Sequence, residues 1–145
     1  TANTTDGIDS INADLDEVLA RNEPQLVEMN WGDWEGQRLP ELRASLGEQM
    51  TTAEAMGLDL LPPNGESPRM VQQRLLSWLQ SLPPSPQEIG IICHKGVLRA
   101  LISSALNWDM TDDCPIKVAW NKGLLFKWDA TSGLTLLEYN VPLDK

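Results

Sequence analysis

Hydrophobic positions recur along the chain at two different spacings, which together predict helices and strands. Apolar residues return every three or four positions over residues 8–19, 39–55 and 68–82, the period of a helix with one buried face. Residues 89–93 form a short apolar run rich in β-branched side chains, as buried strands do. This mixture of helices and strands predicts an α/β fold.

The C-terminal part alternates apolar and polar residues, which predicts two or three strands. Residues 116–120 alternate, and residues 124–128 and 134–139 flank a turn-forming sequence at 130–133. Two alternating runs joined by a short turn that contains glycine are typical of a β-hairpin. We therefore expect the chain to close with a hairpin.

The helix expected over residues 68–82 has a clear start. Ser67 is a good N-cap residue, and Pro68 suits the first helical position because its missing N–H has no partner there in any helix. The apolar residues that follow predict one buried stripe, made of Val71, Leu75, Trp78, Leu79 and Leu82.

Residues 89–101 contain the only histidine and carry the first functional prediction. His94 and Lys95 follow the apolar run at 89–93 and precede a second apolar run with helical spacing. In open α/β sheets, ligands bind where a strand ends and a helix begins, because unpaired N–H groups and the helix dipole attract anions. With Lys95 adding positive charge, we predict a phosphate-type site. The alternative is a structural histidine in the core, but its position in the chain favours a functional one.

Composition narrows the possible partners. At 145 residues and 41% hydrophobic, residues 1–145 are expected to form a single domain. A net charge of -10 argues against a nucleic acid or an anionic membrane as partner, because both require basic patches. Cys93 and Cys114 lack the spacing of a zinc site or a disulfide framework. No metal and no cofactor is expected. A cytoplasmic location is the simplest expectation.

Residues 26–36 fit neither helical nor strand spacing. They combine two glycines, two tryptophans and three acidic residues. Glycines that permit unusual backbone angles, with tryptophans that pack the loop down, could hold the Glu28 carboxylate rigidly at a cleft. A surface turn packed by its tryptophans explains the same composition equally well.

A cysteine-dependent phosphatase is a competing hypothesis. Cys93 is followed six residues later by Arg99, the spacing of enzymes in which a thiolate attacks phosphorus and an arginine binds the phosphate. Ile92 stands where those enzymes usually have histidine, and Ala100 where serine or threonine usually follows the arginine. The simpler interpretation is a buried cysteine at the end of a strand.

Three blocks of sequence resemble, in order and spacing, the histidine phosphatase superfamily, in its phosphoglycerate-mutase-like branch. The blocks are residues 26–36, residues 63–67 followed by Val71 and Arg74, and residues 93–101. The resemblance implies a three-layer α/β/α sandwich and phosphoryl transfer through a phosphohistidine, on a small phosphorylated substrate and without a metal.

The resemblance also implies roles for individual residues. His94 resembles the second histidine of the phosphate pocket, Glu28 resembles the general acid, and Lys95 is expected to bind substrate. A cationic or hydrogen-bonding cluster stabilises the charge on the transferring group, and a glutamate can donate the proton. Phosphatase and mutase activity are both compatible with these roles.

The family's R-H-G motif, which carries the nucleophilic histidine, does not occur in these 145 residues. Thr1-Ala2 looks like the end of a later family segment, so we expect the sequence to start roughly fifty residues into the family pattern, without its first strand, either as an N-terminal truncation or as a natural remnant. This chain is then expected to be inactive alone and weakly stable, because unpaired strand edges are left open. A non-catalytic module that binds an anion beside His94 is the third hypothesis.

Overall fold

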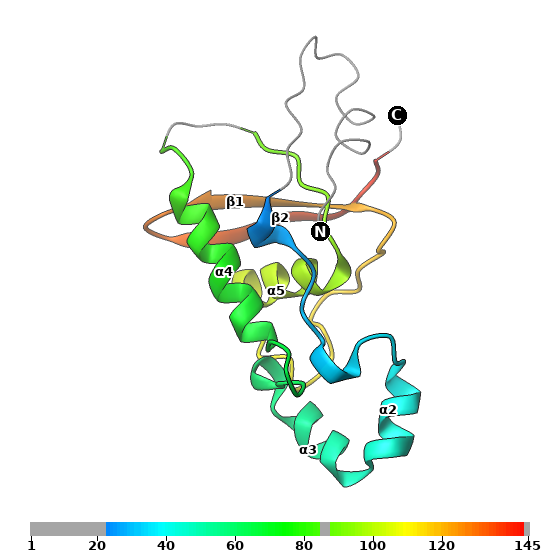
Figure 1. The fold of residues 1–145 in the computed structure, drawn as a ribbon. Helices are drawn as coiled ribbons and strands as arrows, with labels where there is room; N and C mark the ends of the chain where they lie inside the picture. The colour runs from blue at the N-terminus through cyan, green and yellow to red at the C-terminus, as the bar shows by residue number, and fades with distance from the viewer. Residues whose placement is uncertain (1–22, 85–87, 144–145) are drawn as a thin grey trace.

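The computed structural model describes residues 23–84 and 88–143, and within them helices are combined with one antiparallel sheet, an α/β arrangement. Figure 1 shows the sheet lying across helices α4 and α5, with α2 and α3 at the far end of α4. The helix predicted over residues 8–19 lies outside the described residues. Among the described residues, none of the helices has the length and apolar character to cross a membrane.

Helix α4, Pro68–Ser81, confirms the predicted start and buried stripe. The Ser67 hydroxyl accepts a hydrogen bond from the Met70 N–H at 3.2 Å, which caps the first turn. The helix ends before Leu82 and Pro83, since a residue before proline is disfavoured in the helical conformation. Its buried residues are Val71, Leu75, Trp78 and Leu79, while Leu82 is half-buried against them.

Helix α5, Lys95–Leu106, packs against α4 and forms the other half of the main core. Asn107 ends it in the left-handed conformation (φ 54°), which asparagine tolerates better than most residues. The buried apolar residues of α5 are Val97, Ala100, Leu101 and Ile102. Leu26 and Met29, from the loop before α2, bury their side chains in the same core.

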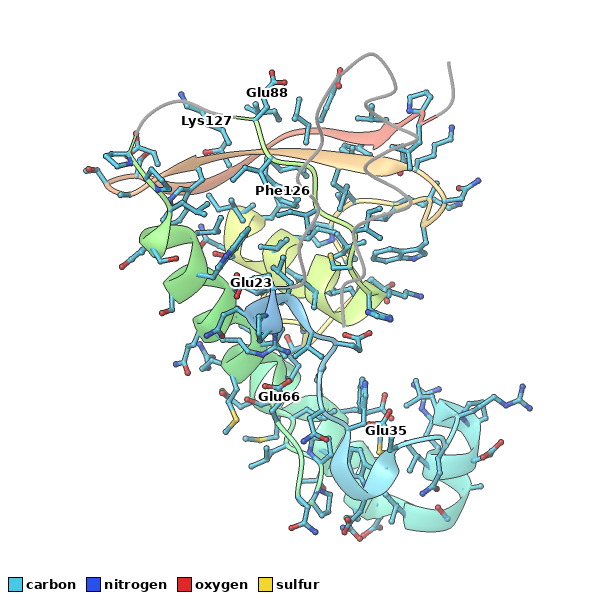
Figure 2. The ribbon with its side chains drawn as sticks, turned by 45° about the horizontal axis from the view of Figure 1, so that its top comes forward. Glu23, Glu35, Glu66, Glu88, Phe126 and Lys127 are labelled. Atoms are coloured by element: carbon cyan, nitrogen blue, oxygen red, sulfur yellow. The ribbon has the colours of Figure 1, made fainter. Side chains whose placement is uncertain are left out.

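The predicted hairpin is confirmed. Strand β1, Gly123–Asp129, pairs antiparallel with β2, Gly133–Val141, and the Asp129 carboxylate accepts hydrogen bonds from the N–H groups of the turn at 131 and 132. In Figure 2, Phe126 points from the sheet toward the helices and Lys127 points away. This alternation lets one face of the sheet cover the core, as period-two patterning requires.

The helix predicted over residues 39–55 is two helices. α2, Leu39–Leu46, and α3, Glu48–Ala55, are separated by Gly47, whose φ of 56° favours glycine and interrupts the helix. The break folds the two helices onto a small second core of Trp34, Leu42 and Met50. Short 3₁₀ turns occupy Pro24–Leu26, Gly32–Trp34 and Gly57–Asp59.

Two of the predicted strands, including the optional third strand of the C-terminal part, do not form within residues 23–84 and 88–143. Residues 89–93 and 116–120 have no regular secondary structure. A strand exists only through backbone hydrogen bonds to a neighbour, and no described segment pairs with 89–93, although Ile91 and Cys93 still pack on the core. Residues 116–120 are held instead by a side chain: Asn140 accepts from the Ala119 N–H at 2.7 Å and donates to the Lys117 carbonyl at 3.0 Å.

Candidate active site

His94 stands at the entrance to helix α5, as the sequence predicts, although an irregular segment rather than a strand leads to it. Its backbone is extended (φ -94°, ψ 165°), and its carbonyl accepts the first helical hydrogen bond from the Leu98 N–H at 3.1 Å. The imidazole is exposed and does not cap the helix. The next residue, Lys95, is also exposed and places its ammonium 4.8 Å from the centre of the Trp120 ring.

The Glu28 carboxylate reaches the same end of α5 from 68 positions away in the sequence. One carboxylate oxygen accepts from the Gly96 N–H at 3.1 Å, and the other accepts from the N–H of its own neighbour Met29 at 2.8 Å. A carboxylate is favoured there because helix N-termini carry unpaired N–H groups and positive partial charge. The fold therefore brings Glu28 and His94 to one place, the first turn of α5.

The loop that carries Glu28 is joined to the loop before α4. The Glu66 N–H donates to the Asn30 carbonyl at 2.8 Å, and the Asn30 N–H donates to the Glu66 carboxylate at 2.9 Å. Gly32, with φ of 53°, passes so close to the backbone of residues 63–65 that a Cβ would overlap it. The ordered loop predicted over 26–36 is thus present, and only part of it behaves as a surface turn.

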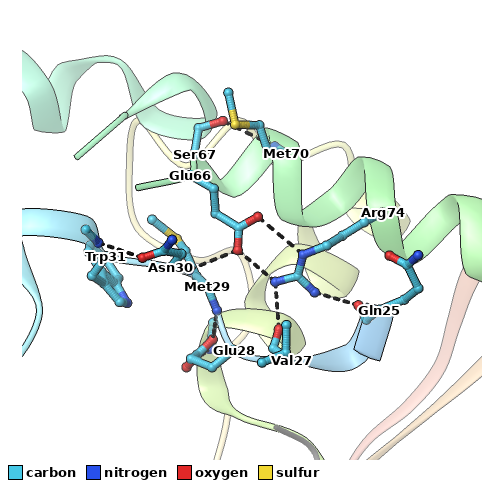
Figure 3. Close-up of polar contacts among 12 residues, drawn as sticks. Gln25, Val27, Glu28, Met29, Asn30, Trp31, Glu66, Ser67, Met70 and Arg74 are labelled. Carbon is cyan, nitrogen blue, oxygen red and sulfur yellow. Dashed lines mark hydrogen bonds and ion pairs between the residues drawn. The ribbon is translucent and has the colours of Figure 1, made fainter. Parts of the chain in front are cut away.

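Arg74, from α4, connects these parts (Figure 3). Its guanidinium donates to the carbonyls of Gln25 at 2.5 Å and Val27 at 2.6 Å, and pairs with the Glu66 carboxylate at 2.8 Å. The Arg74 and Glu66 side chains are only 17% and 20% exposed, whereas the Arg43–Glu54 pair on α2 and α3 is 55% and 33% exposed. Arg74 and Glu66 therefore form the most enclosed ion pair of the described residues.

The charge on Glu66 is maintained despite its burial. Burial by itself raises the pKa of the Glu66 carboxyl, but the hydrogen bonds from Arg74 and from the Asn30 N–H, with the Arg74 charge, outweigh it. The pKa of Glu66 consequently lies below its ordinary value. The carboxylate is ionised at neutral pH and stays bound to Arg74.

The comparison with protein families decides the assignment. The sequence model of the histidine phosphatase superfamily (branch 1) matches residues 4–124, which is most of the chain. The chain belongs to the histidine phosphatase superfamily. A search of curated proteins gave no match. The family match agrees with the resemblance of the three sequence blocks, all of which lie inside the matched residues.

The position of Cys93 in this member of the superfamily does not suit the cysteine-dependent mechanism. Burial, with a smaller contribution from the Glu28 charge, raises the pKa of the Cys93 thiol to about 12, whereas a nucleophilic cysteine needs a lowered pKa. The Arg99 guanidinium lies 5.0 Å from the centre of the Trp108 ring, at the side of α5. The spacing of Cys93 and Arg99 therefore does not produce a thiolate site.

A polar hollow of about 290 Å³ lies at the other end of α5, away from His94. Its lining residues are Leu58, Arg69, Gln72, Ser103, Ser104, Asn107, Trp108 and Asp109. Arg69 is paired with Asp59, and Gln72 donates to Ser103, so these polar groups already have partners within the chain. Among residues 23–84 and 88–143, no three His, Cys, Asp or Glu side chains are grouped to hold a metal ion.

Sequence reasoning alone did not assign a role to Arg74, Glu66 or Gly96 in the site. Arg74 and Glu66 lie eight positions apart, and nothing in that spacing reveals that the arginine also binds two carbonyls near residue 26. Gly96 follows His94 and Lys95 in the sequence. A residue without Cβ is favoured there because the folded chain places the Glu28 carboxylate against it, which the local sequence does not reveal. Only long-range contacts identify these three residues.

Proposed function

We propose that this chain provides the second-histidine part of a phosphoryl-transfer site that acts on small phosphomonoesters. His94 and Lys95 bind the phosphoryl group, and Glu28 is the general acid. The single observation that supports this most is the Glu28 carboxylate bonded to the first turn of α5, beside His94. The nucleophile in this reaction is the histidine of the family's R-H-G motif, which does not occur in these 145 residues, where His94 is the only histidine.

The proposed reaction has two steps. The R-H-G histidine attacks phosphorus, the bond from phosphorus to the ester oxygen breaks, and Glu28 gives its proton to the leaving oxygen. Water then attacks the phosphorus of the phosphohistidine and gives a proton to the Glu28 carboxylate, the P–N bond breaks, and inorganic phosphate and the free R-H-G histidine result. His94, Lys95 and the N-terminus of α5 stabilise negative charge on the transferring oxygens throughout.

We further propose that residues 1–145 belong to a single domain with a three-layer α/β/α sandwich. Residues 89–93 are already apolar and lie on the core through Ile91 and Cys93. A neighbouring strand from the R-H-G segment supplies the backbone partner that these residues lack. Residues 89–93 then become a strand of the main sheet, and His94 follows that strand directly.

Labelling with a ³²P-phosphomonoester tests the assignment of the nucleophile. The 145-residue chain is expected to form no acid-labile phosphoprotein, whereas the protein that also contains the R-H-G segment forms one and turns over. An acid-labile adduct on the 145-residue chain would make His94 the nucleophile and refute the proposal. If the R-H-G-containing protein binds phosphate without turnover, a non-catalytic anion-binding module is favoured instead. The observation behind this second candidate function is the single histidine of the chain.

Glu28→Gln in the R-H-G-containing protein tests the general acid. With an alkyl phosphate we expect kcat to fall by roughly 10²- to 10⁴-fold, the usual contribution of a positioned acid. Both substrates share the later hydrolysis step, so the first step is followed separately as phosphohistidine formation in a single turnover. In that step the loss with 4-nitrophenyl phosphate should be much smaller than with the alkyl phosphate, because 4-nitrophenolate leaves without a proton. Equal losses in phosphohistidine formation on both substrates would contradict a proton-donating role for Glu28.

A further inference from the structure

The backbone is fixed by hydrogen bonds both before and after Glu28 in the sequence. Before it, the carbonyls of Gln25 and Val27 both accept from Arg74, and after it, the Asn30 N–H and carbonyl are both bonded to Glu66. Figure 3 shows Arg74 and Glu66 side by side over this segment. The backbone around Glu28 is therefore fixed by one ion pair, whose two members come from α4 and the loop before it.

Only an arginine can make this set of contacts. Its planar guanidinium directs separate N–H groups at Gln25, Val27 and both oxygens of Glu66. A lysine carries the same charge on a single nitrogen and cannot span these acceptors together. Arg69, five positions earlier on α4, makes only an exposed pair with Asp59, 46% and 50% exposed, so it provides a matched control.

We propose that Arg74, together with Glu66, is a positioning residue for the reaction: it fixes the backbone on both sides of Glu28 and so aims the carboxyl at the first turn of α5. The catalytic consequence rests on the proposed function of Glu28. Among the described residues, Arg74 donates hydrogen bonds to Gln25, Val27 and Glu66, so it acts on Glu28 through the backbone and through Glu66. Misplacement of a reacting group by about 1 Å costs on the order of a hundredfold in rate, which sets the scale of the expected effect.

The first test compares the Gly96 amide resonance by NMR among variants of the 145-residue chain at about pH 7. Because Gly96 donates to the Glu28 carboxylate, Glu28→Gln, which replaces the charged acceptor, should shift this resonance measurably. Arg74→Lys is expected to shift it in the same direction by at least half that amount, and Arg69→Lys to leave it unchanged. An unchanged Gly96 resonance in Arg74→Lys would overturn the proposal. If Arg74→Lys does not fold, Glu66→Gln gives the same reading, because it removes the charge that holds Arg74.

The second test measures kcat and KM on an alkyl phosphate in the R-H-G-containing protein. Arg74→Lys should lower kcat by about tenfold or more with KM within about twofold, because proton donation rather than binding is impaired. In the Glu28→Gln background, Arg74→Lys should lower kcat by less than about twofold, since residues that act through one group are not additive. An additive loss would show that Arg74 acts elsewhere and would overturn the proposal. If Glu28→Gln itself leaves kcat intact, the proposed general acid fails, while the NMR result still decides whether Arg74 positions Glu28.

Discussion

Gly96 decides whether the Glu28 carboxylate can approach helix α5. A Cβ built on Gly96 would lie 3.0 Å from the carboxyl carbon of Glu28 and 3.2 Å from its bonded oxygen, closer than side chains ordinarily approach. Glycine therefore permits this contact through the space it leaves and not through an unusual backbone angle, because a Cβ would displace the Glu28 carboxyl. His94 and Lys95, the two residues before Gly96, are both exposed, and the Lys95 ammonium lies over the Trp120 ring.

Gly96→Ala is expected to separate Glu28 from α5 without unfolding the protein. Alanine is favoured over glycine in helices by roughly 0.5–1 kcal/mol, so the helix itself should not be weakened. In the R-H-G-containing protein we expect kcat on an alkyl phosphate to fall by roughly tenfold to a hundredfold. Thermal melting serves as the control for folding, and unchanged kcat would mean that the contact between Gly96 and Glu28 is not needed for turnover.

Cys93→Ser distinguishes the histidine mechanism from the cysteine mechanism. With its thiol pKa raised to about 12 by burial, Cys93 is neutral near pH 7 and cannot act as a thiolate. We expect kcat of the R-H-G-containing protein to stay within about twofold of the wild type. Loss of all activity in a variant that still melts cooperatively would restore the cysteine-dependent hypothesis.

At the scale of elements, helix α4 is the support on which the site depends. Its start is fixed by the Ser67 cap, its apolar stripe is buried against α5, and its polar side carries Arg74 toward the Glu28 loop. Ser67 also follows Glu66 directly, so the residue that begins the helix adjoins the partner of Arg74. The position of Glu28 therefore depends on where α4 begins.

Ser67→Ala is expected to destabilise the protein by about 1 kcal/mol, the usual cost of losing a serine cap, because the Met70 N–H loses its acceptor. Ser104→Ala is a suitable control, since Ser104 lies inside α5, where alanine is a favourable helix former. Urea unfolding of both variants of the 145-residue chain measures the difference. Equal stability of the two variants would contradict the importance of the cap.

At the scale of the whole molecule, the net negative charge opposes binding of the proposed anionic substrate, and the first turn of α5 is the exception. The net charge of -10 repels anions in general. Lys95 and the N-terminus of α5 supply local attraction, part of which the Glu28 carboxylate neutralises. The proposed anionic substrate would therefore have to be recognised locally rather than drawn in by the overall field.

Acid should destabilise the whole fold, and Glu66 should account for a measurable part of this. Hydrogen bonds or ion pairs hold several carboxyl pKa values below their ordinary range, those of Glu54, Asp59, Glu66, Asp109 and Asp129. A lowered folded-state pKa contributes stability that is complete above the unfolded-state pKa, about 4 for these groups, and is lost as pH falls through the folded-state value. The melting temperature should therefore decrease as pH drops below about 4.

Glu66→Gln tests this assignment. At pH 7 the variant should be less stable by about 1–3 kcal/mol, because Arg74 loses its charged partner in an enclosed site. The difference from the wild type should shrink as pH falls, since the wild-type carboxyl then becomes neutral as well. Glu54→Gln, at the more exposed pair with Arg43, should change stability less at pH 7. A difference between Glu66→Gln and wild type that is independent of pH would contradict the assignment.

The sequence by itself determined the elements whose signals are local. Helix α4 with its cap, the beginning of α5 at His94 and the C-terminal hairpin all follow from spacing, capping residues and turn residues that interact within a few positions. The three sequence blocks likewise identified the superfamily that the family match then showed. These features could be predicted because each one depends on neighbours in the chain.

Tertiary structure alone decided the features that depend on distant partners. Residues 89–93 have the composition of a strand but not its hydrogen bonds, because a strand needs a neighbour that no local pattern specifies. The Asn140 amide replaces strand pairing at 117–119 for the same reason, through contacts more than twenty positions apart. The enclosed ion pair of Arg74 and Glu66, and the contact of Glu28 with Gly96, form only when separate loops and helices pack together.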